Sequence, residues 1–165
     1  MGNDATRFCK RIPIRAGIQE IYNAWTIPAE LEKWFLRKAT FTSPDGRVKA
    51  PSEPAAKGDQ YHWLWHGYGD DMYEDRPVLD ANGRDLFSFM FSGECVVKVH
   101  IKAEEGETIC ELWQENIPPV DNPADSLHVL CGEGWTFYLA NLKSILEGGI
   151  DLRNKNERLK RVISS

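Results

Sequence analysis

The 165-residue chain lacks several features that would assign it to a class at once. Its 20 lysines and arginines are outnumbered by 25 aspartates and glutamates, which gives a formal net charge of −5. No overall positive field is available to attract a phosphate backbone, so we expect no nucleic-acid partner. Its apolar runs fall far short of the ~20 residues that cross a bilayer, and the start MGNDATRFCKR contains no apolar signal core. We therefore expect no membrane span and a cytoplasmic location.

Motifs of common metal sites and enzymes are missing as well. The four cysteines form no CxxC pair and have no histidine at metal-finger spacing, which favours reduced thiols over a metal site. The sequence contains no Ser-His-Asp order, no glycine-rich phosphate loop and no nucleophile elbow. We therefore expect no metal, no cofactor and no catalytic residues, and a non-enzymatic role is favoured.

What is present is the composition of an ordinary globular domain, with 42% apolar and 27% charged residues. A chain of this length buries roughly 68 to 70% of its unfolded surface, which is enough for one substantial core. The end of the chain is polar and locally basic. We predict a single domain over residues 1–165, with a core over about 7–153 and a polar tail over 154–165.

Hydrophobic periodicity indicates the order of the elements. Residues 7–15 alternate as a strand does, residues 18–25 carry apolar side chains at helical spacing, and Pro28 begins a second short helix, PAELEKWF. From about residue 38 the period is two, and turn pairs such as Asn82-Gly83 and Glu105-Gly106 separate the apolar runs. The strands expected there are 38–42, 58–67, 71–80, 85–92, 94–103 and 107–117.

The last part of the core reads as a crossover followed by a long helix. Three prolines in residues 117–126 lead out of the sheet, and GWTFYLANLKSILEGG places its apolar residues along one stripe before Gly148-Gly149. Whether Gly132 and Gly134 kink this helix or precede it stays open. The order of elements predicts an α+β, helix-grip fold: a curved antiparallel sheet of six or seven strands around a long C-terminal helix, with two short helices after the first strand.

Four stretches resemble the START-like (SRPBCC, helix-grip) superfamily. They are IYNAWTIPAELEKWF, the G-x-x-Y-x-W pattern that begins at Gly58, ETICELWQENI and GWTFYLANLKSILEGGIDLR. Within the superfamily they resemble the single-domain bacterial type of the branch named after the activator of the ninety-kilodalton heat-shock protein's ATPase. The resemblance covers about residues 7–153. It implies a deep cavity between sheet and helix, which the superfamily uses for sterols, lipids, polyketides and plant hormones.

The stretch YHWLWHGYGDD, residues 61–71, could be a metal site, a nucleic-acid stacking platform or a cavity wall. His62 and His66 lie four residues apart, which on a strand separates them by roughly 13 Å, so they cannot share one metal ion. A stacking platform needs interleaved basic residues, and here the neighbours are histidines and aspartates. The period of two instead places the three alternating aromatic residues, Tyr61, Trp63 and Trp65, on one face, as a cavity wall requires.

A ligand-binding cavity lined by aromatic side chains is therefore the predicted site. The predicted lining residues are Tyr61, Trp63, Trp65, Phe87, Phe89, Phe91, Trp113, Trp135 and Tyr138. So many rings can either enclose a pocket or pack into a solid core, and the sequence leaves both open.

Three functions are compatible with this prediction. The first is the binding of a small apolar or aromatic molecule. The second is a protein-interaction module of the chaperone-associated type, for which the basic tail is the supporting feature: Arg153, Lys155, Arg158, Lys160 and Arg161. The third is a cyclase-like or hydrolase-like enzyme. The polar candidates for it are Glu74, Asp75, His100, Glu111 and Gln114, with Glu111 or His100 as the acting group.

Overall fold

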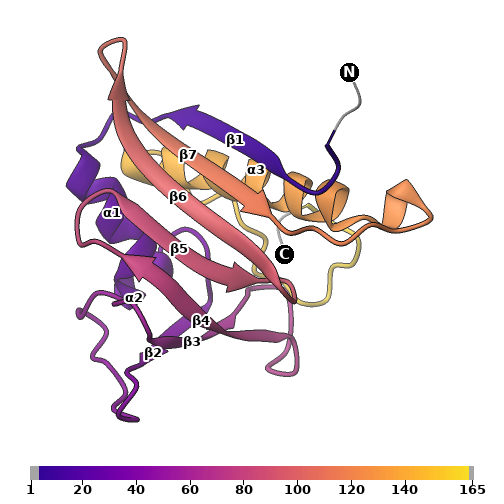
Figure 1. Ribbon diagram of the computed structural model, residues 1–165, viewed down its shortest axis with the longest axis horizontal. Helices are drawn as coiled ribbons and strands as arrows, with labels where there is room; N and C mark the ends of the chain where they lie inside the picture. Colours follow the sequence, from indigo (N-terminus) through magenta and orange to yellow (C-terminus); the bar gives the residue numbers. More distant parts are fainter. Residues whose placement is uncertain (1–3, 164–165) are drawn as a thin grey trace.

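The fold is a seven-stranded antiparallel sheet that curves around helices, as the computed structural model shows for residues 4–163 (Figure 1). The strands are β1 (Phe8–Pro13), β2 (Lys38–Thr42), β3 (Gln60–Leu64), β4 (Tyr73–Ala81), β5 (Leu86–Phe91), β6 (Cys95–Glu104) and β7 (Glu107–Glu115). Their order across the sheet is β1-β7-β6-β5-β4-β3-β2, so the first strand forms an edge beside the last. The predicted α+β architecture is confirmed, and every predicted strand is present.

Turns at the predicted places fix the register of the meander. Between β6 and β7 both turn residues, Glu105 and Gly106, have positive φ angles of 49° and 80°, as two-residue hairpins prefer. Between β4 and β5 the Asn82 side chain accepts hydrogen bonds from the backbone N–H groups of three following residues at 3.0 Å. Because register and the alternation of side chains are linked, these turns also determine which residues face the helices.

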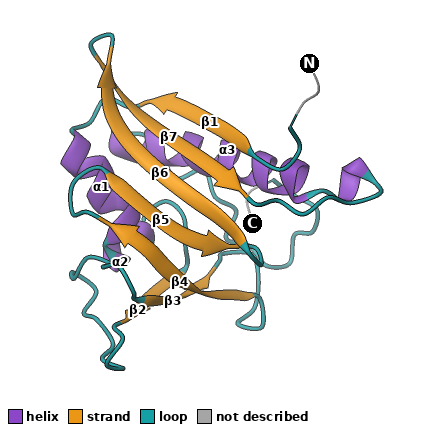
Figure 2. Cartoon of the chain, viewed as in Figure 1, coloured by secondary structure: helices purple, strands orange, loops and turns teal. Residues whose placement is uncertain are grey.

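The helical elements are α1 (Ile18–Thr26), α2 (Pro28–Leu31), the 3₁₀ turn η1 (Pro123–Asp125) and α3 (Leu127–Leu146). Helices α1, α2 and α3 lie on one side of the sheet (Figure 2). Helix α3 begins after Ser126, whose side chain accepts a hydrogen bond from the N–H of His128 at 3.0 Å. Gly132 and Gly134 therefore lie inside α3 and do not precede it.

Helix α2 is shorter than predicted, because it ends at Leu31 and does not continue through the Trp-Phe pair. Neighbouring residues of an α-helix point about 100° apart. A continued helix would therefore aim Trp34 and Phe35 in different directions, whereas the turn that replaces it buries both rings. The indole Nε1 of Trp34 donates to the carbonyl of Ala24 in α1 at 2.8 Å, which ties the turn to the first helix.

The core lies between the concave face of the sheet and the helices. On β6, Val97, Val99 and Ile101 are buried, and His100 between them is exposed on the convex face. Helix α3 presents Trp135 and Leu139 to this core, in which both are buried. The concave face is thus the apolar one, as the pattern of period two predicts.

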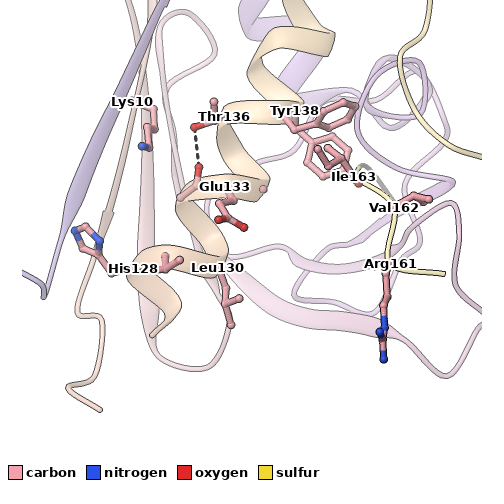
Figure 3. Close-up of a pocket in the computed structure, with 13 residues that line it drawn as sticks. Lys10, His128, Leu130, Glu133, Thr136, Tyr138, Arg161, Val162 and Ile163 are labelled. Carbon is pink, nitrogen blue, oxygen red and sulfur yellow. Dashed lines mark hydrogen bonds between the residues drawn. The ribbon is translucent and has the colours of Figure 1, made fainter. Parts of the chain in front are cut away.

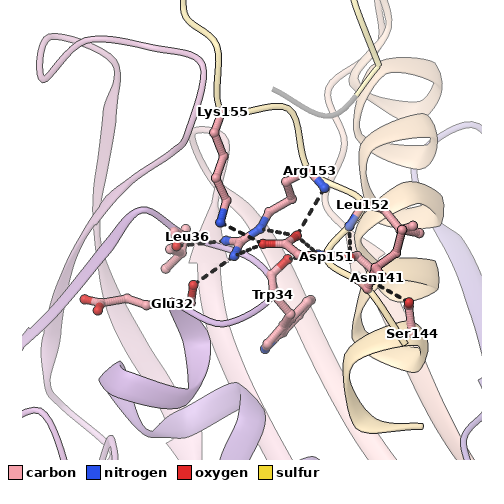
Figure 4. A network of polar contacts seen from close by, with 10 residues as sticks. Glu32, Trp34, Leu36, Asn141, Ser144, Asp151, Leu152, Arg153 and Lys155 are labelled. Carbon is pink, nitrogen blue, oxygen red and sulfur yellow. Dashed lines mark hydrogen bonds and ion pairs between the residues drawn. The ribbon is translucent and has the colours of Figure 1, made fainter. Parts of the chain in front are cut away.

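A polar network ties the segment after α3 to the turn that follows α2 (Figure 4). The guanidinium of Arg153 donates to the carbonyls of Leu36 at 2.9 Å and Glu32 at 3.0 Å, and to the Asp151 carboxylate at 2.8 and 2.9 Å. Asn141 of α3 donates to the same carboxylate at 3.1 Å. We call Asn141, Asp151 and Arg153 the C-terminal clamp.

The clamp changes the interpretation of the predicted basic tail. Only 2% of the Arg153 side chain is exposed, so this residue is a structural tie and not part of a free basic surface. Lys155 also belongs to the network, since its Nζ lies 3.0 Å from the Asp151 carboxylate. The basic surface is therefore smaller than the sequence predicts.

Candidate functional site

The inner part of the predicted lining is a set of rings in mutual contact. Tyr61 and Trp63 stack with their centroids 3.8 Å apart, and Phe89 meets the Trp63 ring edge-on at 5.1 Å. Phe87 packs against Phe89 at 5.2 Å, and Trp135 of α3 lies 6.4 Å from the Phe89 ring. All five side chains are buried. Here the rings fill the space between sheet and helix as a core.

The outer part of the lining surrounds a pocket of about 240 Å³. Three predicted residues meet there: Trp65 just after β3, Phe91 at the end of β5 and Tyr138 on α3. The other residues that line it are Tyr68, Met72, Tyr73 and Glu74. We call these seven residues the aromatic pocket. Its lining comes from the ends of β3 and β5, the loop between β3 and β4, the start of β4, and α3.

Strand alternation explains why these side chains converge. Trp65 continues the face of Trp63, and Phe91 continues the face of Phe89. Glu74 is the residue of β4 that pairs with Trp63 in the antiparallel register, so its side chain lies on the same concave face. Gly67, with a φ angle of 89°, lets the chain turn sharply after Trp65. The turn brings the tyrosine and methionine of the loop over the strand ends.

Sequence reasoning missed most of the loop side of this pocket. Met72 and Tyr73 fall at the start of the predicted strand 71–80 and Tyr68 in the loop before it, and nothing in their spacing marks them as lining residues. The Gly-Tyr-Gly turn directly after the alternating aromatics was a usable signal. Glu74 was predicted only as a polar candidate for the enzymatic alternative. Its position next to Trp63 becomes clear only once the pairing of β3 with β4 is known.

Glu74 is the one charged residue among the seven that form the pocket. Its Oε1 accepts a hydrogen bond from the backbone N–H of Ser92 at 3.2 Å, and its Oε2 lies 3.4 Å from Nε of Arg76. Burial raises the pKa of the carboxyl, although Arg76 and Ser92 act in the opposite direction. Burial also raises the pKa of the Tyr138 hydroxyl, which therefore keeps its proton and can donate.

Trp113 must be removed from the predicted lining. The buried residues of β7 are Cys110, Leu112 and Gln114, so Trp113 points to the convex face. There its indole donates to Glu111 at 3.0 Å, and the guanidinium of Arg7 lies over its ring at 5.2 Å. The prediction failed because a polar residue, Gln114, takes the inward position. Its Oε1 accepts the indole N–H of Trp135 at 2.8 Å.

Both residues proposed to act in an enzyme lie on the same convex face. Glu111 forms ion pairs with Arg11 at 2.9 Å and Lys102 at 3.0 Å. His100, its partner across the β6–β7 pair, is exposed. Neither side chain reaches the aromatic pocket. Both line a separate pocket of about 290 Å³ on the convex face, where Glu111 is already held in ion pairs.

Within residues 4–163 no group of three or more His, Cys, Asp or Glu side chains is arranged to hold a metal ion. His62 instead pairs with Asp75 at 2.5 Å. None of the helices in the same range is long and apolar enough to cross a membrane.

A second, larger groove of about 830 Å³ lies between the first half of α3 and residues 161–163 (Figure 3). Leu130 and Ile163 are exposed apolar residues on its two sides. Lys10, Glu133 and Arg161 add charges of both signs to its lining. The groove was not predicted, because its walls come from two segments about thirty residues apart that the sequence does not connect.

A curved antiparallel sheet wrapped around a long C-terminal helix, with a pocket at the end of their interface, defines a START-like, helix-grip protein. The family model described as "Activator of Hsp90 ATPase homolog 1-like protein" matches residues 15–147. The chain belongs to this family, as the resemblance in its sequence indicated. None of the curated proteins matches the chain.

Solved structures with the same fold come from several bacteria. Protein SSP2350 of Staphylococcus saprophyticus is similar with a TM-score of 0.69 and 16% identity, over 89% of this chain and 96% of that one. The Aha1 dimer of Colwellia psychrerythraea has a TM-score of 0.66 and 18% identity, over 87% and 97%. Protein MLL2253 of Mesorhizobium loti has a TM-score of 0.65 and 17% identity, over 86% and 97%. At identities of 16–18%, these similarities show a shared fold and nothing further.

Proposed function

We propose that this protein binds a small apolar or aromatic molecule in the aromatic pocket. The observation that carries the proposal is the meeting of Trp65, Phe91 and Tyr138 around a pocket of about 240 Å³. Pockets that are mostly apolar and aromatic, with a few polar groups, are typical of small-molecule sites. The hydroxyl of Tyr138 and the carboxyl of Glu74 are the polar groups that would orient the ligand.

The size of the pocket limits the ligand. Sites for drug-sized molecules usually measure about 300–1,000 Å³, and the rings deeper in the interface are already in contact with one another. A sterol would require these rings to move apart. A single aromatic ring, or the head of a longer molecule whose tail remains outside, fits the available space.

The methionine methyl groups of the chain allow ligand binding in the pocket to be followed by NMR. Of its three methionines, Met72 lines the pocket and Met90 lies on the opposite face of β5 from Phe89 and Phe91. In protein labelled with ¹³C at the methionine methyl groups, titration with indole should shift the Met72 signal to saturation and leave the Met90 signal in place. Native mass spectrometry of gently purified protein would show any ligand that is retained.

Two tryptophan variants supply the control. Trp65→Ala removes a wall of the pocket and should weaken indole binding at least tenfold, whereas Trp113→Ala removes a ring from the convex face and should leave it unchanged. If the Met72 signal does not respond to indole, toluene or naphthalene, and the protein is recovered without an adduct, the proposal is wrong.

A second candidate function is self-association through the groove beside α3. An interface between two identical copies must be self-complementary, and this groove combines the apolar Leu130 and Ile163 with Lys10, Arg161 and the acidic Glu133. The Colwellia relative is described as a dimer. In sedimentation velocity, Leu130→Lys should convert a dimer into a monomer, and Leu159→Lys, outside the groove, should not. A wild-type protein that stays monomeric up to millimolar concentration would refute this candidate.

A further inference from the structure

The aromatic pocket combines many rings with a single charge. Four of its aromatic residues come from separate parts of the fold: Trp65 follows β3, Tyr68 lies in the next loop, Phe91 ends β5 and Tyr138 belongs to α3. The thioether of Met72 adds a polarisable group. Tyr73 also borders the pocket, but its ring packs against that of His62 at 5.2 Å and is not counted among the enclosing rings. The rings therefore surround the space and do not form a flat patch on one side of it.

The face of an aromatic ring is negative and attracts cations, so several rings around one space form a preferred site for a positive charge. A carboxylate at the same place reinforces this preference. Glu74 has this position, with only 20% of its side chain exposed. An anionic ligand such as a fatty-acid carboxylate would instead meet both the ring faces and the carboxylate, which disfavour it.

Arg76 partly balances the charge of Glu74, since its Nε lies 3.4 Å from Oε2, while Oε1 accepts a hydrogen bond from the Ser92 N–H. The other basic residues near the pocket have partners outside it. Arg37 pairs with Asp70 in the loop at 2.6 Å. Arg153 is held by the C-terminal clamp. No residue of the pocket lining itself is basic.

On the basis of the proposed function, we infer that the ligand of the aromatic pocket is a small organic cation, an ammonium ion with apolar substituents. Rings on several sides suit the diffuse charge of an alkylated nitrogen, which has no need of a hydrogen-bonding partner on every side. Glu74 supplies the counter-charge from the concave face of the sheet. The volume of about 240 Å³ admits a head group of this kind.

The inference is tested with two molecules of the same shape that differ in charge. Choline and 3,3-dimethylbutan-1-ol differ only in the replacement of the charged nitrogen by carbon. Each is titrated into the ¹³C-methionine protein, and the shift of the Met72 methyl signal gives the dissociation constant. We expect choline to bind about tenfold or more tightly than the alcohol, since a desolvated cation–π contact is worth about one order of magnitude in affinity.

A charge-neutralising variant and a matched control identify the residue responsible. Glu74→Gln should lower the ratio of the two affinities, without bringing it to one because the rings remain, while indole binds as before. Glu107→Gln, at the opposite end of the sheet, should leave the ratio unchanged. The comparison in the wild-type protein does not depend on how the variants fold.

The outcomes separate this inference from the proposed function. If the alcohol binds as well as choline or better, while indole binds at Met72, the cation inference is wrong and the binding function stands. If neither indole nor choline shifts the Met72 signal, both are wrong. If choline and the alcohol bind to Glu74→Gln with the same affinity ratio as to the wild-type protein, the carboxylate has no part in recognition and its assigned role is wrong.

Discussion

The C-terminal clamp should be the most acid-sensitive part of the fold, and Asp151→Asn is the substitution that tests this. The Asp151 carboxylate accepts hydrogen bonds from Arg153 at 2.8 and 2.9 Å and from Asn141 at 3.1 Å, and Lys155 pairs with it at 3.0 Å. An asparagine would keep one acceptor oxygen and turn an N–H₂ group toward donors. The buried guanidinium would then lose its counter-charge.

The magnitude follows from the burial of the partners. Removal of one member of a buried ion pair typically costs about 3–5 kcal/mol. Here Asp151 is 23% exposed and Arg153 keeps the carbonyls of Leu36 and Glu32 as acceptors, which reduces the loss. We expect the free energy of unfolding to fall by about 2–3 kcal/mol. For a chain of this size that corresponds to a decrease in Tm of roughly 5–10 °C.

The stabilisation by the Asp151–Arg153 ion pair depends on pH in a defined way. Burial opposes ionisation of Asp151, but the hydrogen bonds from Arg153, Lys155 and Asn141 together outweigh it and lower the pKa of the carboxyl below its ordinary value. The folded state therefore gains stability above the unfolded pKa of about 3.9, and this gain is lost as the pH falls below that value toward the folded pKa. Urea unfolding at pH 7 should separate wild type from Asp151→Asn by the full amount, and the difference should shrink progressively as the pH falls below about 4.

The control is Glu157→Gln, which changes the same charge on the exposed tail and should alter the free energy of unfolding by less than about 0.5 kcal/mol. A difference of less than about 0.5 kcal/mol between wild type and Asp151→Asn at pH 7 would refute the clamp as a stabilising element. A difference in the free energy of unfolding that does not shrink at acidic pH would refute it as well.

Three further predictions test other parts of the fold. Leu112→Ala, on the concave face, should lower the free energy of unfolding by about 2–5 kcal/mol. Trp113→Ala, at the next residue on the convex face, should lower it clearly less. Equal losses in urea titrations would contradict the assignment of the two faces. Gly134→Ala should stabilise α3 by up to about 1 kcal/mol, because a Cβ at this position meets no atom within 4 Å; a lower Tm would show that this glycine has a role in the groove. Burial raises the pKa of Cys110 to about 12, so at pH 8 a thiol reagent should modify Cys9 and Cys131 and spare Cys110 until the protein is unfolded, and rapid modification of Cys110 in the native state would contradict its placement.

Much of the fold could be predicted because its signals are local. The alternation along β5 and β6 extends over only a few residues, and so do the turns at Asn82-Gly83 and Glu105-Gly106. The structure has strands and turns at the positions that these patterns predicted. The apolar stripe after Gly134 and the order of the elements likewise predicted the long helix enclosed by the sheet, and the family resemblance agreed with this order. Even the stripe of Trp135 and Leu139 on α3 was readable as its buried face.

The features that escaped prediction depend on contacts between distant segments. Gln114 is buried on the same face as Cys110 and Leu112, where its Oε1 accepts a hydrogen bond from Trp135 of α3, and Trp113 therefore lies on the convex face. Arg153 looks like one of several basic tail residues until the carbonyls of Glu32 and Leu36 approach it. The aromatic pocket likewise forms only when the loop after β3 meets α3, and single-segment periodicity carries no information about that meeting.

The position of β1 at the edge of the sheet has a consequence for folding on the ribosome. Phe8 to Pro13 pair with residues of β7, a separation of roughly one hundred residues along the chain, so the first strand to be synthesised has no partner until the last one appears. The strands β2 to β7 can form hairpins with their neighbours as they emerge. Strand β1 must wait, unpaired and apolar on one side, and during that time it is the segment most exposed to aggregation and to chaperones.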